Sequence, residues 1–384
     1  MARRSMDVVV IGSGFSGSLL AWILAAAGRS VVLLDRGTHP RFAIGESSTP
    51  LADFLLEQIA DEFSLSALRP LARWGTWQTA LPHLRAGPKR GFSYYQHQRH
   101  QPFHESEEHE ASLLVAASNS DQLADTHWMR SDVDHWFAQQ AVAAGVQLLE
   151  GCEITEIQIG DSTANGKQKY ACRLATRQDA HETLLETKEI VDASGGGAVL
   201  PRQLNLSAND EQLANHTATL FGHFRNVGSM TQWLQEHGLS TNDDPFPSDA
   251  AAQHHLLENG WMWMLRFAGP ADERITSVGI VCEQDRWHQS LIKQDRHQMW
   301  KQLVSQYPTL DELLCDSELV APFDSSLGTP QLGWIPRISR CWSVAAGENW
   351  SLLPSTVGII DPLHSTGIAH ALSGVLRVAR YLLK

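Results

Sequence analysis

The sequence has few cysteines and fewer basic than acidic residues, and each shortage excludes a class of protein. Its 384 residues include five cysteines, which form no CxxC pair and lie at least 20 residues apart. This spacing indicates neither a disulfide framework nor a zinc site, so we expect buried thiols in a reducing cytoplasm. Thirty Lys and Arg against 43 Asp and Glu leave a net charge of −13, which argues against nucleic-acid binding by phosphate neutralisation.

Long apolar runs are also missing. Residues 1–24 resemble a signal peptide at first, but Asp7 and three glycines interrupt the apolar run, and no suitable cleavage site follows. No other segment offers 18 uninterrupted apolar residues, so we expect no membrane span and a cytoplasmic location. Hydrophobic residues at 43% and charged residues at 19% indicate a globular protein. The length predicts two domains or one elaborated domain.

What the sequence does contain, close to its start, is the pattern of a dinucleotide-binding βαβ unit. A β-branched run at 7–11 leads into Gly12-Ser13-Gly14-Phe15-Ser16-Gly17, an apolar helical pattern to Gly28, and a strand-like run at 30–34 that ends at Asp35. The three glycines allow a tight turn, a close approach to a pyrophosphate and close helix–strand contact, respectively. Asp35 is placed to accept hydrogen bonds from a ribose diol. The alternative is a glycine-rich turn in another kind of α/β protein.

Further pieces of the same unit recur along the chain. We expect a helix from Arg130 to about residue 144, a short strand at 190–191 running into Asp192-Ala193-Ser194-Gly195, a strand at 342–346, and a final helix over 367–383. Residues 160–169 have the composition of a hairpin tip.

Sheet-like segments lie between these pieces, at 217–224, 261–267 and 276–282, with a helix-like run at 291–307. The sequence therefore predicts an α/β fold in which a discontinuous, Rossmann-like nucleotide-binding domain holds an inserted antiparallel-sheet substrate domain. The predicted ranges are 1–72, 104–204 and 324–384 for the first domain, and 73–103 and 205–323 for the second.

Several segments, in this order, resemble the FAD-dependent monooxygenases of the para-hydroxybenzoate hydroxylase type. They are the glycine motif at 12–17, His39-Pro40-Arg41 with Gly45-Glu46-Ser47, Arg130, Asp192-Ala193-Ser194-Gly195, and Asp361-Pro362-Leu363-His364-Ser365-Thr366-Gly367. Within that group the chain looks most like the flavin-dependent halogenases. Gly260-Trp261-Met262-Trp263-Met264-Leu265 is similar to their WxWxI(P) motif, and the segment from Asp361 is similar to their flavin and halide loop.

The resemblance implies FAD as the cofactor, with the isoalloxazine near Gly45-Glu46-Ser47 and Ser365-Thr366-Gly367. The residues that it assigns to FAD are Gly12, Gly14, Gly17, Asp35, Gly45, Glu46, Ser47, Arg130, Asp192, Gly195, Asp361, Ser365, Thr366 and Gly367. We expect no metal site. The histidines at 83, 97, 100, 104 and 109 are interpreted as part of a solvated loop, because a metal needs converging ligands.

The resemblance also implies a chemistry. Reduced FAD reacts with O2 to give a C4a-hydroperoxide, which transfers oxygen to an electron-rich ring or is attacked by halide to give hypohalous acid. The halogenases orient or capture that acid with a lysine, and Lys89, in Lys89-Arg90-Gly91-Phe92-Ser93-Tyr94, resembles it. An ammonium there would stabilise a developing oxyanion, and a neutral amine could form an adduct. The alternative is a solvent-facing loop lysine beside Pro88.

Some positions depart from the halogenase pattern. Arg266 stands where the motif has proline, Leu265 replaces its isoleucine, and Ile359 replaces an aromatic residue. His364 takes the place of a glutamate that assists substrate deprotonation in tryptophan halogenases. It could accept a proton from an aromatic carbon or a phenol, or it could have only a structural role in its loop.

Trp261 and Trp263 alternate along an expected strand, so both rings lie on one face. They either form a wall between flavin and substrate or belong to the core.

From the sequence we predict an FAD-dependent oxygenase of the halogenase-like group. Its substrate would be an electron-rich aromatic: an indole, a phenol, or a tryptophan within a partner protein. The alternatives are a true halogenase that uses Lys89 and a flavin-binding partner protein without catalysis. The sequence has no second GxGxxG unit, so reduced flavin would come from a separate reductase or from nicotinamide that binds transiently.

Overall fold

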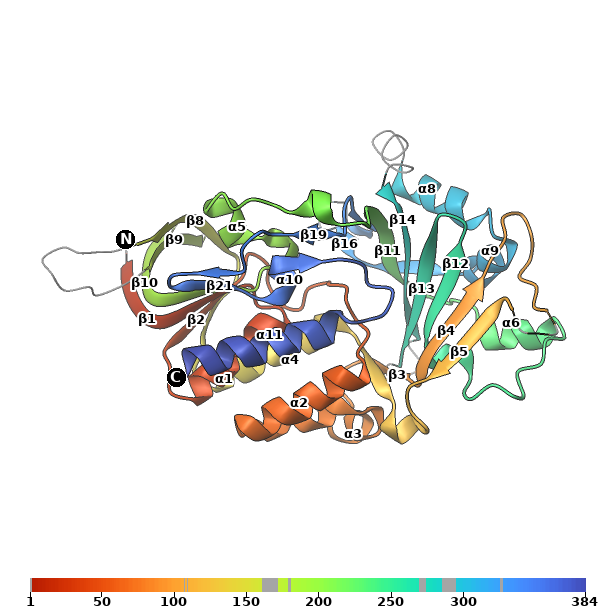
Figure 1. Cartoon of the computed structure of the whole chain (residues 1–384), viewed down its shortest axis with the longest axis horizontal. Coiled ribbons are helices and arrows are strands. Elements are labelled where there is room, and N and C mark those ends of the chain that lie inside the picture. Colours follow the sequence, from red (N-terminus) through yellow and green to blue (C-terminus); the bar gives the residue numbers. More distant parts are fainter. Residues whose placement is uncertain are drawn as a thin grey trace, which may run out of the picture.

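Two eight-stranded sheets lie side by side in the computed structural model, each built from several parts of the chain (Figure 1). The structure describes residues 2–106, 108, 110–160, 172–178, 181–268, 274–284, 295–324 and 327–384. Among these residues, no helix is both long enough and apolar enough to cross a membrane.

The first sheet is the nucleotide-binding unit expected from the sequence. β1 (Ala2–Ile11) pairs in parallel with β10 (His181–Asp192) and β2 (Val31–Leu34), and further parallel pairs add β7 (Gln147–Leu149) and β21 (Trp350–Leu352). The antiparallel strands β8 (Cys152–Ile159), β9 (Cys172–Gln178) and β20 (Ala346–Gly347) extend it. The central segments at 8–11 and 31–34 are buried, as expected of parallel strands with both faces covered.

Helices cover one face of this sheet: α1 (Phe15–Ala26), α4 (Arg130–Ala143) and α11 (Gly367–Leu382), with α2 (Pro50–Glu62) and α3 (Trp74–Ala80) beside them (Figure 1). In α11 the buried residues recur every three or four positions, at Ile368, Leu372, Val375 and Ala379, so one stripe of the helix faces the core. The helices expected to begin at Arg130 and at residue 367 are confirmed.

The second sheet runs β15 (Glu318–Ala321), β11 (Thr217–Arg225), β14 (Ile275–Glu283), β13 (Gly260–Phe267), β12 (Ala252–Leu257), β4 (Gly91–Gln96) and β5 (Ser112–Ala116), with β18 (Gly333–Ile335) on β11. All its pairs are antiparallel except β4 with β12. β5 and β18 come from segments that we expected in the first domain, so this sheet reaches beyond the predicted insert. The domain boundaries stay a prediction.

The remaining elements connect and cover the sheets. They are η1 (Ser66–Ala72), η2 (Asp121–Leu123), η3 (Gly195–Gly197), α5 (Val199–Gln203), η4 (Asp210–Gln212), α6 (Met230–Glu236), η5 (Ser248–Ala250), α8 (Arg296–Val304), α9 (Pro308–Leu314), β16 (Phe323–Asp324), β17 (Thr329–Pro330), β19 (Arg340–Cys341), α10 (Pro354–Val357) and β22 (Gly358–Ile359).

Two expectations from the sequence are wrong. The strand placed at 342–346 does not form, because Trp342 and Ser343 donate their N–H groups to Val357 and Ser207. The strand of this region that pairs in parallel with β10 is the later β21. Cys315 is exposed, although Cys152, Cys172 and Cys282 are buried as expected. The hairpin tip expected at 160–169 lies, apart from residue 160, outside the described residues.

A short two-stranded ribbon joins the two sheets. It consists of β3 (Ala86–Lys89) and β6 (Asp125–Trp128), in the antiparallel register Ala86↔Trp128 to Lys89↔Asp125. β3 also contacts the end of β13, and Ala86 bridges to Ala268, the residue that follows that strand. Gly87 makes this contact possible: a Cβ there would lie 1.8 Å from the carbonyl oxygen of Arg266.

Gly87→Ala should therefore destabilise the protein by about 3 kcal/mol or more, because backbone atoms cannot move aside as a flexible side chain can. Thermal unfolding measures the effect. Gly196→Ala is the matched control, since a Cβ at Gly196 meets nothing within 4 Å. Equal unfolding temperatures for the two variants would contradict this account of the ribbon.

Candidate functional site

The glycine turn after β1 has the geometry that a dinucleotide pyrophosphate requires. Gly12 has φ +101°, and a Cβ there would lie 2.6 Å from the Ala193 carbonyl oxygen. A Cβ on Gly17 would lie 2.0 Å from the Gly12 carbonyl oxygen. Gly14 is different: its added Cβ would lie 3.6 to 3.8 Å from the side chains of Asp134, Arg41 and Arg130. Two guanidinium groups therefore face the start of α1, where N–H groups already favour an anion.

Asp35 ends β2 as expected and is held by several donors. Its carboxylate accepts hydrogen bonds from the N–H and hydroxyl of Ser13, from Gly37 N–H and from Arg41. Burial alone would raise the pKa of Asp35, but the charge of Arg41 and these hydrogen bonds bring that pKa below its usual value. The carboxylate is therefore ionised at neutral pH, as a ribose-binding acceptor must be.

Arg130 fixes the loop that carries Gly45-Glu46-Ser47. Its guanidinium makes two hydrogen bonds to Asp134, of 2.7 and 2.9 Å, and donates to the carbonyls of Ile44 and Gly45. It also lies over the ring of Phe15, 4.7 Å from the centroid. Arg130 thus connects the start of α1 to the loop expected beside the isoalloxazine.

Glu46 connects that loop to the second sheet. Its Oε1 lies 2.6 Å from Nε2 of His223 on β11, and both side chains are buried. Trp128 of β6 donates its N–H to the Glu46 carbonyl. The loop therefore has fixed contacts with α4, the ribbon and the second sheet.

The other expected cofactor residues lie in two turns, one after β10 and one ahead of α11. Asp192 accepts N–H groups from Ser194 and Leu200, and Gly195, at φ +59°, donates to Thr356 Oγ1. The Asp361 carboxylate accepts the Leu363 N–H. Ser365 is buried at φ +55°, whereas His364 and Thr366 are exposed just ahead of α11.

Buried polar atoms give an independent test of fit for FAD. Among the described residues, His39 Nδ1, Arg41 Nε and Ser47 Oγ are three of the 17 buried side-chain polar atoms that have no hydrogen-bond partner. All three lie in or next to the segments assigned above to the cofactor. Unpaired buried polar atoms are costly, and polar groups of a dinucleotide would satisfy them. The residues present therefore fit this cofactor.

Lys89 is fully buried at the end of β3, so the alternative of a solvent-facing loop lysine is wrong. Its Nζ donates a 2.6 Å hydrogen bond to the Ser48 carbonyl and lies 4.0 Å from the centroid of the Phe92 ring. Ser48 in turn bonds to Thr126 of β6 through both its N–H and its hydroxyl. The lysine thus reaches the loop expected beside the isoalloxazine.

Burial lowers the pKa of Lys89 to about 7, against the opposing effect of the Asp125 and Asp53 carboxyl groups. A lysine with this pKa exchanges its proton readily at neutral pH. Shifts of this size caused by burial are typical of functional sites.

A row of aromatic rings extends from Lys89 to the two expected tryptophans. The Phe92 ring centroid lies 5.8 Å from that of His254, which lies 5.4 Å from Trp261, and Trp261 lies 5.9 Å from Trp263. Trp261 and Trp263 share one face of β13, as the alternation predicts, and both are buried in one cluster. Trp261 also hydrogen-bonds to Asp361. The structure therefore brings Lys89, the tryptophans and the Asp361 loop together.

His254 links Lys89 and His364 electrostatically. Burial, together with the nearby charges of Lys89 and His364, lowers its pKa to about 4. His254 is therefore neutral at neutral pH.

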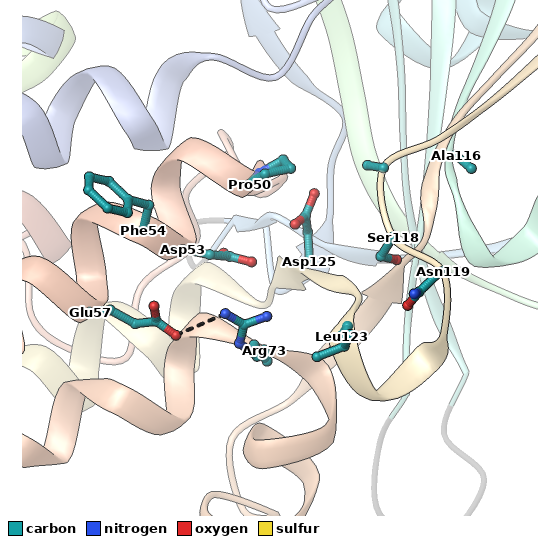
Figure 2. A pocket seen from close by; sticks show the side chains of 11 residues that line it. Pro50, Asp53, Phe54, Glu57, Arg73, Ala116, Ser118, Asn119, Leu123 and Asp125 are labelled. Atoms are coloured by element: carbon teal, nitrogen blue, oxygen red, sulfur yellow. Dashed lines mark hydrogen bonds and ion pairs between the residues drawn. The ribbon is translucent and has the colours of Figure 1, made fainter.

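Beside Lys89 a cavity of about 600 Å³ opens between α2 and the loop after β5. Figure 2 shows its acidic lining: Asp53 from α2, Asp125 from β6, and Glu57 in an ion pair with Arg73. Asp53 and Asp125 are 7% and 2% exposed. A second cavity of similar volume is lined by Trp261, Asp361 and Leu363.

The sequence pattern of the FAD dependent oxidoreductase family matches residues 7–358. The chain belongs to this family. Its cofactor is FAD, and it is an FAD-dependent enzyme.

Individual relatives are halogenases. The chain is 28% identical to tetracycline 7-halogenase of Kitasatospora aureofaciens and 23% identical to monodechloroaminopyrrolnitrin halogenase PrnC of Pseudomonas fluorescens, over 96% and 98% of its length. It spans 61% of each of these relatives. Halogenase PltM, solved with phloroglucinol and FAD, is 26% identical with a TM-score of 0.84, over 98% of this chain and 69% of PltM. These relatives support the halogenase part of the resemblance but not its para-hydroxybenzoate hydroxylase part.

Two residues outside the sequence-based assignment lie at the centre of this site. Asp53 and Asp125 flank Lys89, yet the sequence shows one as an acidic residue in an amphipathic helix and the other in a short strand. A carboxylate at a helix start or strand end is ordinary, so no local pattern marks either one. Glu46 was expected at the flavin, but its contact with His223 was not.

His97 corrects another interpretation. It is buried, and its Nε2 lies 3.0 Å from Nδ1 of His255, so it does not belong to a solvated loop. Burial lowers its pKa to about 4. Among the described residues, no group of three or more His, Cys, Asp or Glu is arranged to hold a metal ion.

Gly14→Val tests the cofactor assignment without disturbing the fold. Gly14 has φ −62° and ψ 169°, which any residue adopts, and an added Cβ makes only ordinary contacts. The variant should therefore fold, but its side chain would occupy the approach to the pyrophosphate and weaken FAD binding by about 100-fold or more. Titration of the apoprotein with FAD measures this affinity. Ala26→Val, on the exposed end of α1, is the control. Unchanged affinity in a folded Gly14→Val protein would sink the assignment.

Proposed function

We propose that this enzyme halogenates an electron-rich aromatic substrate and that Lys89 directs the halogen. The observation that carries the proposal is the position of Lys89: a fully buried lysine, bonded to the Ser48 carbonyl beside the expected flavin loop and joined to Trp261 by a row of rings. The halogenase relatives support the same reaction.

Bound FAD, when reduced, activates O2 and in the presence of halide supplies hypohalous acid. We assign its pyrophosphate to the start of α1 with Gly12, Gly14 and Arg41, and its ribose to Asp35. Arg130 holds the loop with Gly45, Glu46 and Ser47 in place through backbone hydrogen bonds.

Lys89 acts as a hydrogen-bond donor in this proposal. Its ammonium can hold the oxygen of hypohalous acid and stabilise the negative charge that develops on that oxygen as the O–X bond breaks. The surrounding rings exclude water, which strengthens the interaction. Trp261 and Trp263 form the wall of the passage through which the ring approaches.

The oxygenase that we predicted from the sequence relied on departures from the halogenase pattern. Arg266 now has another explanation, since its guanidinium bonds to Asp249 and to the carbonyls of Val227 and Gly228. His364 is exposed and remains available to accept the proton that the ring loses. For these reasons we now favour halogenation over direct oxygen transfer.

The substrate class that we propose is a phenol or indole, free or carried by a partner protein. A halogen electrophile needs an electron-rich ring, and the PltM structure contains phloroglucinol, an aromatic triol. A separate reductase would supply the reduced flavin.

Lys89→Ala should lower the yield of halogenated product by at least about 10²–10³-fold, because a preorganised donor is removed. FAD affinity and consumption of O2 by the reduced flavin should change little, because Lys89 acts after oxygen activation. The assay supplies reduced FAD, bromide or chloride, and a set of phenols and indoles, and detects products by mass spectrometry.

Lys188→Ala is the matched control, since Lys188 is a lysine at the surface that pairs with Asp7. Hydroxylated instead of halogenated products would identify an oxygenase. In that case Lys89→Ala should show a more modest loss of product, accompanied by release of H2O2. Unchanged turnover on the authentic substrate would remove Lys89 from either mechanism.

The ratio of halogenated product to oxidised FAD should fall as pH rises through about 7. Because the pKa of Lys89 is lowered to about 7, the ammonium is present below that pH and lost above it. The ratio isolates this step from flavin oxidation. A ratio that rises with pH would show that the neutral amine is the working form, and would overturn the donor role.

A further inference from the structure

A buried carboxyl pair lies between Lys89 and the cavity of Figure 2. Lys89 and Asp125 are register partners on β3 and β6, so their side chains project to the same side of the ribbon. Asp53 reaches the same place from the first turn of α2. Asp53 and Asp125 line the cavity, and both carboxyl groups act electrostatically on Lys89.

The two carboxyl groups require a proton between them. Asp53 and Asp125 are close enough to hydrogen-bond to each other. Among the described residues, no N–H or O–H donor reaches Asp53 Oδ1 or Asp125 Oδ2, although both atoms are buried. Ionised carboxylates only accept hydrogen bonds, so two that face each other are stable when one of them is protonated.

We propose that Asp53 and Asp125 share one proton and act as positioning residues that keep Lys89 charged and restore its proton after each turnover. The proton lies mainly on Asp53, so the carboxylate of Asp125, the register partner of Lys89, keeps its charge beside the ammonium, and the cavity gives the pair access to water. The shared proton is independent of the proposed reaction. The return of a proton to Lys89 after each turnover rests on that reaction.

Halogen transfer and the return of the proton to Lys89 together form a closed cycle. The O–X bond of hypohalous acid breaks, a C–X bond forms, and Lys89 gives its proton to the departing hydroxide, which becomes water. The ring carbon gives its proton to His364, which is exposed and passes it to solvent. The Lys89 amine takes the proton of the carboxyl pair, and water in the cavity reprotonates the pair, so that HOX and ArH give ArX and H2O.

The other titratable and charged groups around Lys89 do not change the assignment of a shared proton to Asp53 and Asp125. His127 of β6 and His254 of β12 are buried, and burial lowers their pKa values to about 3 and about 4, so both are neutral at neutral pH. Arg73 acts on the carboxyl pair, while its guanidinium pairs with Glu57. Burial raises the pKa of both Asp53 and Asp125, as a shared proton requires.

The test is the titration midpoint of Lys89 in the FAD-loaded protein, followed by NMR of labelled lysine. The chain has seven lysines, and Lys89→Met assigns the signal. Asp125→Asn removes the charged partner, so the midpoint should fall by about 1–3 pH units. In Asp53→Asn the amide donates to Asp125 as the protonated carboxyl does, so the midpoint should stay within about half a unit of the wild-type value.

Glu57→Gln, at the same cavity but paired with Arg73, is the control and should leave the midpoint unchanged. Equal falls for Asp53→Asn and Asp125→Asn would mean that both carboxylates are ionised, and would overturn the shared proton. An unchanged titration midpoint of Lys89 in both variants would also overturn the shared proton. If Asp125→Asn does not fold, Asp53→Asn alone decides, because a fall of about 1–3 units there contradicts the proposal.

The same measurement separates this inference from the reaction. The unequal response of the two variants, in a wild-type protein that yields no halogenated product, would support the carboxyl pair and refute the halogenase. Halogenated product together with equal responses would support the halogenase and refute the pair.

Discussion

The site depends on the burial of one ammonium group. Removing a charged lysine from water costs several kcal/mol unless protein groups replace the water. For Lys89 those groups are the Ser48 carbonyl, the face of Phe92 and the carboxyl groups of Asp53 and Asp125. Each comes from a different element, so the lysine can be charged only where the cofactor loop, the ribbon, the second sheet and α2 meet.

The same constraint explains why the cofactor loop is held so firmly. Ser48 is bonded to Thr126 of β6 through its N–H and its hydroxyl, and its carbonyl accepts the hydrogen bond of Lys89. Arg130 holds the carbonyls of Ile44 and Gly45, and Glu46 contacts His223. A loop that carries an acceptor for a buried cation must not shift, because a displacement of one ångström would leave the cation without it. The two sheets are thereby fixed relative to each other at the place where chemistry is proposed.

The features of the fold and the site that could be predicted from the sequence are those set by residues close together in the chain. The glycine turn, Asp35 and the helices at 130 and 367 depend on neighbours in sequence, and their patterns were readable. Lys89 was identified by resemblance, but its burial was not, because the groups around it come from distant segments. Asp53 and Asp125 each lie 36 positions from Lys89, and only the ribbon and α2 bring them to it.

The errors have the same origin. The strand expected at 342–346 has apolar residues of the right kind, but its N–H groups find loop partners, and β21 occupies the sheet position instead. His97 was predicted to be solvated because charged residues surround it in the sequence. In the structure His255 of β12 lies against it. Pairings between distant segments decided both cases.

Arg266 shows what a departure from a family motif can mean. Its side chain joins the end of β13 to Asp249 and to the backbone at Val227 and Gly228, so it serves as a tether for two surface turns. Proline, which has no polar side chain, could not provide that tether. The residue at this position therefore reflects how the end of β13 is anchored to neighbouring turns. Sorting such enzymes by this residue would group them by the anchorage of those turns rather than by the atom that they transfer.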